Sequence, residues 1–296
     1  MAHLPHCEAH IRPAQSADMP ACVEVYHQSL SDMQARHNFP PSPGQPPGEM
    51  LALYQHILET GIFYVSEVDG QIAGMACAIL RGSWWFLSGF WVRPGMQRSG
   101  LGGPLLRRVW QAGEQAGASQ FFVWSSVDLP AMATYLKLGM LPGYQILTFE
   151  GKALLPPEPP AGYALGLLEI DFASRADEHT LDVQRQVDHE FWSQTGANGW
   201  QVRHQDELIG YFYLAGGLIG PAAWLDPAHA IPLLTLACQA AALQGTSVRM
   251  RIPGVNHAAL RFALGTGLQL IGYSHLLLTA PFGRLEHYLP SGPGLF

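Results

Sequence analysis

The feature that most constrains the fold of this 296-residue chain is an internal repeat. A constant offset of 128 (232 − 104) aligns turn, cap and core positions of the two halves without a gap. The matching pairs are Pro104/Pro232, Leu105/Leu233, Leu106/Leu234, Gly117/Gly245, Ser119/Ser247, Asp128/Asn256, Ala131/Ala259 and Gly139/Gly267. A fixed period of this kind is typical of a duplicated structural unit. The chain is therefore predicted to fold as two copies of one domain, which its length allows.

The two copies differ in one loop. Residues 91–94 match residues 224–227 at a shift of 133, which exceeds 128 by five. Nine residues separate the two flanking prolines of this loop in the first copy, and four separate them in the second. The second copy also has Ala263 at the position of Tyr135. We interpret the second copy as a degenerate one, which kept the fold of the first copy and lost residues that carry its function.

The loop that the second copy lacks is rich in glycine and follows an apolar, aromatic run, residues 84–92, that predicts a buried strand. Pro104 then opens a segment with helical spacing of apolar residues, a position where proline is tolerated. A strand, such a loop and a helix N-terminus point several backbone N–H groups at one spot, which suits a phosphate. A Gly-x-Gly alone is more typical of a tight turn or a helix cap.

The first half predicts alternating short elements around this loop. Two strands joined by Asp69-Gly70 form a hairpin, because that dipeptide favours a two-residue turn. The expected strands are 11–14, 62–68, 71–80, 84–92, 121–126 and 144–149, and the expected helices are 18–33, 50–60, 104–116 and 130–138. We expect a first domain over residues 1–150, a proline-rich linker over 151–162 and a degenerate second domain over 163–296.

Composition excludes several classes of function. The net charge of −7, with two lysines in the whole chain, argues against a nucleic-acid partner. The four cysteines lack metal spacing and do not suggest a disulfide framework, so a reducing, cytoplasmic location is expected. His3, His6, Cys7 and His10 match no standard zinc spacing, and we expect no metal. The charge-free run 208–225 is better explained by two strands and a glycine turn than by a membrane helix, so no membrane partner is expected.

Two motifs resemble those of the GCN5-related N-acetyltransferase (GNAT) superfamily. Val92-x-Pro94-x-x-Gln97-x-x-Gly100-x-Gly102 is similar to its acyl-CoA pyrophosphate loop. Ala131-x-x-x-Tyr135-x-Lys137-x-Gly139-Met140 is similar to its second motif, although Asp128 stands at the usual Asn and Met140 at the usual Phe. The resemblance covers residues 9–150, and residues 163–280 only through the repeat. It implies an α/β (α+β) fold with two tandem domains, each a mixed, mostly antiparallel sheet flanked by helices.

The resemblance also implies a site for acetyl-CoA as co-substrate. A backbone N–H near Phe90 to Val92 would polarise the thioester carbonyl, and Tyr135 would protonate the departing thiolate as general acid. Arg98 would add a charge to the phosphate site, and Arg107 or Arg108 would reach the outer 3′-phosphate. The expected cofactor-binding residues are Phe90, Trp91, Val92, Gln97, Arg98, Ser99, Gly100, Leu101, Gly102, Gly103 and Asp128.

The expected activity is direct acetyl transfer from acetyl-CoA to a primary amine of a small molecule or peptide. Residues 84–91 contain no carboxylate to act as base, and among Glu67, Asp69, Asp128, His37 and a water at Ser88 none is singled out. One alternative is a non-catalytic acyl-CoA sensor or interaction module. Another is a small-molecule acetyltransferase acting on an aminoglycoside or a thiol-sugar. The acceptor, the acyl length and the oligomeric state stay open.

Overall fold

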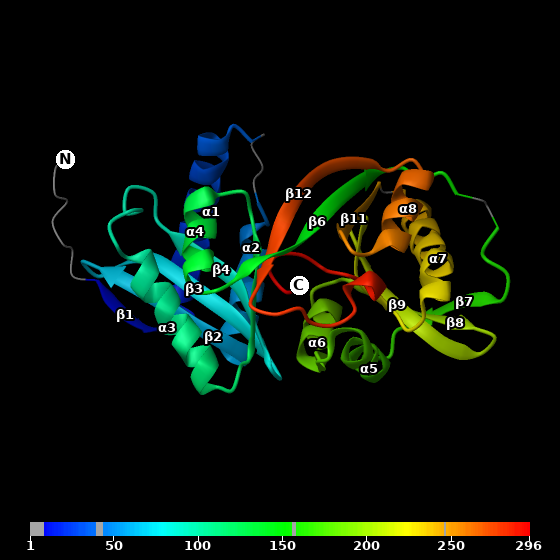
Figure 1. The fold of residues 1–296 in the computed structure, drawn as a ribbon, viewed down its shortest axis with the longest axis horizontal. Helices are drawn as coiled ribbons and strands as arrows, with labels where there is room; N and C mark the ends of the chain where they lie inside the picture. Colours follow the sequence, from blue (N-terminus) through cyan, green and yellow to red (C-terminus); the bar gives the residue numbers. More distant parts are fainter. Residues whose placement is uncertain (1–8, 40–43, 156–157, 246) are drawn as a thin grey trace. The chain divides into compact units, whose positions relative to one another are not determined.

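The structure, a computed structural model, describes residues 9–39, 44–155, 158–245 and 247–296. The chain divides into two compact units. The first comprises Met1–Val123 and Val127–Met140, and the second comprises Trp124–Ser126 and Leu141–Phe296. Each unit has its own sheet region and its own helices (Figure 1).

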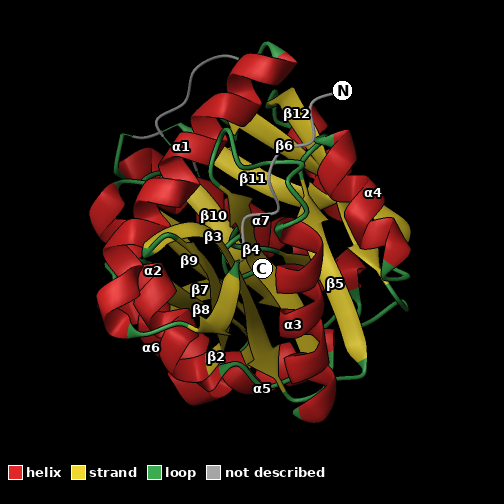
Figure 2. Ribbon diagram, turned by 90° about the vertical axis from the view of Figure 1, so that its left-hand side faces the viewer, coloured by secondary structure: helices red, strands yellow, loops and turns green. Residues whose placement is uncertain are grey.

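The first unit is built on strands in the order β1-β2-β3-β4-β5. All neighbours are antiparallel except β4 and β5, which are parallel. Helices α1 and α2 cover one side of β2–β4 and α3 covers the other (Figure 2). The elements are β1 (His10–Pro13), α1 (Met19–His37), α2 (Pro47–Thr60), β2 (Gly61–Val68), β3 (Gln71–Arg81), β4 (Trp84–Val92), α3 (Gly102–Gln115), β5 (Gln120–Ser125) and α4 (Leu129–Lys137).

Helix α3 is fixed to the sheet by the side chain of Trp85. The indole is buried, and its Nε1 donates a hydrogen bond to the backbone oxygen of Val109 at 3.2 Å. Its ring fills the space beside Gly113, where an added Cβ would lie closer than 3.0 Å to Trp85 Cδ1. Glycine is unfavourable inside a helix, so its presence here reflects the close approach of the ring. This contact fixes the position of α3 along β4.

We expect Gly113→Ala to lower the free energy of unfolding by about 1–2 kcal/mol. Overpacking a buried site costs about 1–3 kcal/mol, which outweighs the gain of up to about 1 kcal/mol in helix propensity. Chemical denaturation measures the difference. Gly48→Ala is the matched control, because no atom lies within 4 Å of a Cβ built at this residue of α2. Equal stability of the two variants would contradict the role given to Trp85.

The second unit has strands in the order β12-β6-β11-β10-β9-β8-β7, with β13 paired to β10. Strand β6, which continues from the first half of the chain, lies between β11 and β12 and is antiparallel to both (Figure 1). The elements are β6 (Leu141–Gly151), β7 (Tyr163–Leu167), α5 (Ile170–Leu181), α6 (Gln186–Gln194), β8 (Asn198–His204), β9 (Glu207–Ala215), β10 (Leu218–Trp224), α7 (Ala230–Leu243), β11 (Val248–Pro253), α8 (His257–Gly265), β12 (Gln269–Leu278) and β13 (Tyr288–Leu289).

The duplication expected from the sequence is present element by element. Helices α3 and α7, strands β5 and β11, and helices α4 and α8 all start and end at the same constant offset. The strand register agrees as well: the pair Phe86↔Phe122 in the first unit corresponds to Ile219↔Met250 in the second. The α/β class with two mixed, mostly antiparallel sheet regions is therefore confirmed.

Chain order and packing assign β6 differently. The sequence places residues 141–150 in the first domain, whereas their contacts group them with the second unit. Phe149 of β6 packs into the second unit's core together with Trp224 and Leu233. The domain limits at residues 150 and 163 come from the sequence repeat and remain a prediction. The compact units are defined by contacts, and their limits therefore differ.

The charge-free run 208–225 forms β9 and β10, joined at Gly216 and Gly217, as the sequence suggested. Among the described helices, none combines the length and the hydrophobicity that crossing a membrane requires.

A buried ionic network lies inside the second unit. The carboxylate of Asp177 accepts hydrogen bonds from Arg185 Nε at 2.8 Å, from His189 Nε2 at 3.0 Å and from the hydroxyl of Tyr211. All four side chains are at most 1 % exposed. Burial by itself would raise the pKa of Asp177, but the Arg185 charge and these hydrogen bonds lower it below its ordinary value.

We expect Asp177→Asn to cost about 3–5 kcal/mol of unfolding free energy at neutral pH, because it leaves Arg185 buried without its counter-charge. The lowered pKa means that the Asp177 contribution is complete above the unfolded-state pKa and is lost as pH falls through the folded-state pKa. Denaturation across acidic pH measures both effects. Asp171→Asn, at an exposed position of the same helix, should change stability by less than about 1 kcal/mol. A similar loss in both variants would contradict this account.

Candidate functional site

The loop between β4 and α3 has the backbone geometry of an anion cradle. Gly95, Arg98 and Gly100 have positive φ values of 84°, 63° and 92°. The backbone N–H groups of residues 97–103 donate no hydrogen bond to any described residue. Residues 98–100 are exposed and lie directly before the start of α3. Free amides and a helix N-terminus together favour a bound anion.

Side chains of the loop hold its shape. Gln97 Nε2 donates to the backbone oxygen of Val92 at 3.2 Å and to Asp32 Oδ2 at 3.4 Å. Ser99 Oγ donates to the backbone oxygen of Met96 at 2.6 Å. Leu101 is buried in a small apolar cluster with Val68 and Ala73. Among the described residues Arg98 makes no hydrogen bond or ion pair, so its guanidinium is available to a ligand.

Helix α3 begins at Gly102, two residues before the expected start at Pro104. A Cβ built at Gly102 would lie 3.0 Å from Phe90 Cζ, whereas at Gly103 its nearest neighbour is Arg107 at 3.8 Å. Gly102 therefore lets the aromatic ring of β4 approach the loop, while Gly103 has room for a side chain.

Strand β4 separates from β5 next to this loop. Their paired residues run from Trp84↔Gln120 to Leu87↔Val123 and stop there. At the same level β4 bulges against β3, with Ser88 as the extra residue. The backbone of Phe90, Trp91 and Val92 thus has a partner in β3 and none in β5. The half of β4 beyond Leu87 is therefore open on the side of β5, next to the glycine loop.

A buried thiol supports the bulge. Cys77 of β3 is hydrogen-bonded to the side chain of Ser88 and to the backbone of Gly89. Burial raises the pKa of Cys77, so the thiol stays neutral and acts through its hydrogen bonds. No local pattern around this cysteine singled it out, because its neighbours come from another strand.

Tyr135 of α4 lies beside the bulged half of β4. Its side chain is buried, and its ring centroid is 6.2 Å from that of Phe90. Burial, together with the nearby charge of Asp128, raises the pKa of Tyr135. The phenol is therefore protonated at neutral pH and has a proton to give.

Asp128 belongs to an ion-pair cluster at the start of α4. Its carboxylate lies 3.4 Å from Arg36 NH2 and 3.7 Å from His37 Nε2, and Arg36 Nε also contacts Asp32 at 2.9 Å. The side chain does not cap α4. Sequence reasoning missed Arg36 as a partner, although the i,i+4 spacing of Asp32 and Arg36 was visible.

Two other carboxylates considered as bases have structural roles. Glu67 pairs with Arg12, at 3.0 Å. Asp69 occupies the hairpin turn with a φ of 50°. The described residues contain no group of three or more His, Cys, Asp or Glu side chains placed to hold a metal ion. His3, His6 and Cys7 lie outside the described residues.

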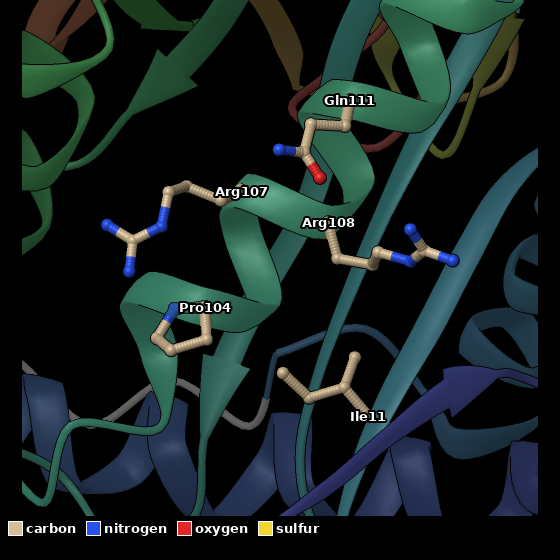
Figure 3. A pocket seen from close by; sticks show the side chains of 5 residues that line it. All are labelled: Ile11, Pro104, Arg107, Arg108 and Gln111. Atoms are coloured by element: carbon tan, nitrogen blue, oxygen red, sulfur yellow. The ribbon is translucent and has the colours of Figure 1, made fainter.

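A basic pocket of about 240 Å³ lies along α3, lined by Ile11, Pro104, Arg107, Arg108 and Gln111. Figure 3 shows the two arginines extending from adjacent helix positions in different directions. The guanidinium of Arg108 lies over the ring of Tyr64, 5.5 Å from its centroid. The pocket adds positive charge one turn beyond the loop amides.

Residues 28–140 match the sequence profile of the Acetyltransferase (GNAT) family. They contain the loop, the bulged strand and Tyr135. The fold of the whole chain is similar to that of a tandem GNAT protein from the clavulanic acid biosynthesis pathway, with a TM-score of 0.62, 14% identity, and coverage of 93% of this chain and 99% of that one. The first half of the chain thus carries the GNAT family match, and the fold of the whole chain is similar to that of tandem GNAT proteins.

Other GNAT structures share this two-unit fold. A protein assigned as an acetyltransferase from Pyrococcus horikoshii superimposes with a TM-score of 0.76 at 17% identity, covering 97% of this chain and 96% of that one. A GCN5-related N-acetyltransferase from Sphaerobacter thermophilus has a TM-score of 0.64 at 16% identity, covering 94% and 96%. No curated protein sequence matches the chain. At these identities the structures show the GNAT fold alone.

We expect Gly102→Val to weaken acetyl-CoA binding at least tenfold, equivalent to about 1.4 kcal/mol. The new side chain must displace Phe90 and disturb the amides at the start of α3. Calorimetric titration measures the affinity, and Gly103→Ala is the matched control because its Cβ has room. If both variants bind acetyl-CoA like the parent, the loop is not the donor site.

Proposed function

We propose that this protein is an acetyl-CoA-dependent N-acetyltransferase that transfers the acetyl group directly to a primary amine. The observation that carries the proposal is the row of unpartnered amides at residues 97–103, in the described part of the chain, beside the bulged, open half of β4. The free amides fit a pyrophosphate, and the open edge of β4 fits an arm that contains amide groups. The match of residues 28–140 to the acetyltransferase family supports this interpretation.

Each part of the donor has a counterpart in the first unit. The amides of residues 97–103 and the guanidinium of Arg98 would hold the pyrophosphate. Arg107 and Arg108, in the basic pocket, would hold the outer 3′-phosphate. The arm would follow β4, where a backbone N–H between Phe90 and Val92 donates to the thioester oxygen. Asp128 would contribute through Arg36, because a carboxylate at the usual Asn position accepts hydrogen bonds and does not donate them.

The chemistry then needs one proton donor on the enzyme. The amine nitrogen attacks the thioester carbon, and negative charge develops on the carbonyl oxygen. The intermediate collapses with cleavage of the carbon–sulfur bond, and Tyr135 gives its proton to the leaving thiolate. The proton that the amine loses goes to solvent, since no side chain is assigned as base.

The first unit is proposed to carry the reaction and the second to be degenerate. The second copy lacks the glycine loop and has Ala263 in place of Tyr135. Trp84, Trp85 and Phe86 are buried in the core, so only the half-buried Phe90 and Trp91 of β4 would favour an apolar or ring-bearing acceptor. The expected cytoplasmic location stays a prediction.

We expect Tyr135→Phe to lower kcat at least tenfold and to leave the KM for acetyl-CoA nearly unchanged, because the hydroxyl acts on the leaving group and not on binding. Thiol release with a panel of primary amines across pH measures both parameters. Tyr273→Phe, at an exposed position of β12, is the control.

Unchanged kcat in Tyr135→Phe would remove this residue from the mechanism. Tight acetyl-CoA binding with no thiol release for any amine would favour a non-catalytic acyl-CoA sensor, an alternative that the absence of a carboxylate on β4 also motivates. Preference for an aminoglycoside or a thiol-sugar in the panel would favour a specialised small-molecule enzyme.

A further inference from the structure

The second unit separates its parallel strands close to the position of the β4–β5 opening, and the edge of β10 beyond this point is called the second cleft. The parallel pairs of β10 and β11 run from Leu218↔Arg249 to Ile219↔Met250 and stop. Strand β10 then bulges against β9 between Ile219 and Ala222. In the repeat, the last parallel pair is the counterpart of Phe86↔Phe122. The second copy therefore opens its parallel pair one residue earlier than the first copy, whose last pair is Leu87↔Val123.

In the second unit this cleft is filled by the chain itself. Strand β13 pairs antiparallel with β10 through Ala222↔Leu289 and Ala223↔Tyr288, and it also contacts β11. The segment follows β12 and is drawn in red in Figure 1. The repeat offset that aligns Trp91 with Trp224 also aligns Gly89 and Phe90 with Ala222 and Ala223. The filled edge of β10 is thus the counterpart of the open edge of β4.

The polar residue at the start of α8 holds the same segment. Asn256 Nδ2 donates to the backbone oxygen of Tyr288 at 3.1 Å, while its Oδ1 caps α8 by accepting from the amide of Ala259 at 3.1 Å. Asn256 is the repeat counterpart of Asp128. An amide at this position donates to a carbonyl group in the cleft, which a carboxylate does not do.

The Tyr288 side chain is enclosed by the interior of the second unit. Its ring is fully buried, and its hydroxyl accepts from Arg185 NH2 at 2.6 Å and donates to the backbone oxygen of Phe296 at 2.9 Å. Arg185 is itself fixed by Asp177. The buried ionic network is therefore connected through Arg185 to the hydroxyl of Tyr288, so it helps to bind the segment that fills the cleft.

Backbone contacts continue beyond Tyr288. Arg251 NH1 of β11 donates to the backbone oxygen of Ser291. A Cβ built at Gly220 would lie 2.6 Å from the backbone oxygen of Pro290, so a glycine at this point of β10 permits the approach. Residues 288–291 are therefore held by main-chain and side-chain groups along their length.

We propose that the second unit is a peptide-binding module whose ligand is the chain's own segment 285–291. The mode is strand addition: main-chain hydrogen bonds to an open edge supply affinity, and a pocket for one side chain supplies specificity. In this copy the segment takes the place that an amide-containing donor arm takes in the first copy, so the second cleft is closed to acyl-CoA. Only this comparison with the donor arm rests on the proposed function; the peptide site does not.

Segment exchange tests the peptide site in the full chain. A protease recognition sequence is inserted after Ala280, at an exposed bend, and the folded protein is cut there. The released segment should stay bound through gel filtration and should exchange with a labelled synthetic peptide of residues 281–296. A peptide carrying Tyr288→Ala should compete at least tenfold more weakly than the parent peptide. A peptide carrying Glu286→Ala, at an exposed position, should compete like the parent.

Two results would overturn the proposal. One is departure of the cut segment with no change in the unfolding midpoint of the protein. The other is equal competition by the Tyr288→Ala and Glu286→Ala peptides.

Calorimetric titration of the uncut protein with acetyl-CoA separates the two proposals. One molecule bound per chain, lost in Gly102→Val, is expected. Two molecules per chain would contradict the closed second cleft. Binding of none would contradict the proposed function of the first unit, while the exchange experiment would still decide the peptide site.

Discussion

The structure depends on one constraint that both copies share: a parallel strand pair that stops after a few residues. Beyond the last pair, the backbone groups on one edge of β4 are no longer paired with β5, and those on one edge of β10 are no longer paired with β11. Backbone N–H and C=O groups must find partners when they are buried. The second copy satisfies this edge with residues 288–289 of its own chain. In the first copy β5 does not pair with this edge, and under the proposed function a ligand would pair with it there.

Electrostatics concentrates positive potential at one place in an acidic chain. The net charge is −7, yet the loop amides, Arg98 and the two arginines of α3 all lie within residues 97–108, in the loop and the first two turns of the helix. Around Tyr135, in contrast, burial and the negative charge of Asp128 disfavour the phenolate and raise the pKa of Tyr135. An anion is thus attracted to the start of α3, and a neutral proton donor is kept next to β4.

The features that could be predicted from the sequence are local or repeated. The hairpin at Asp69-Gly70, the glycine loop and the duplication could be recognised because short-range patterns encode them. Contacts between distant residues could not. The position of β6 depends on strands that come much later in the chain, and the partners of Asp128 come from α1. The network of Asp177, Arg185 and Tyr288 joins three separate segments whose residue types carry no motif.

The placement of β6 has a consequence for synthesis of the chain. Strand β6 ends at Gly151, but its first neighbour, β11, begins only at Val248, and β12 follows later still. At about 5–20 residues per second on the ribosome, β6 waits roughly 5–20 seconds with both edges unpaired. During that interval an unpaired strand is a template for association with other chains. The nascent protein is therefore most exposed to aggregation at its middle, and chaperone demand should peak there.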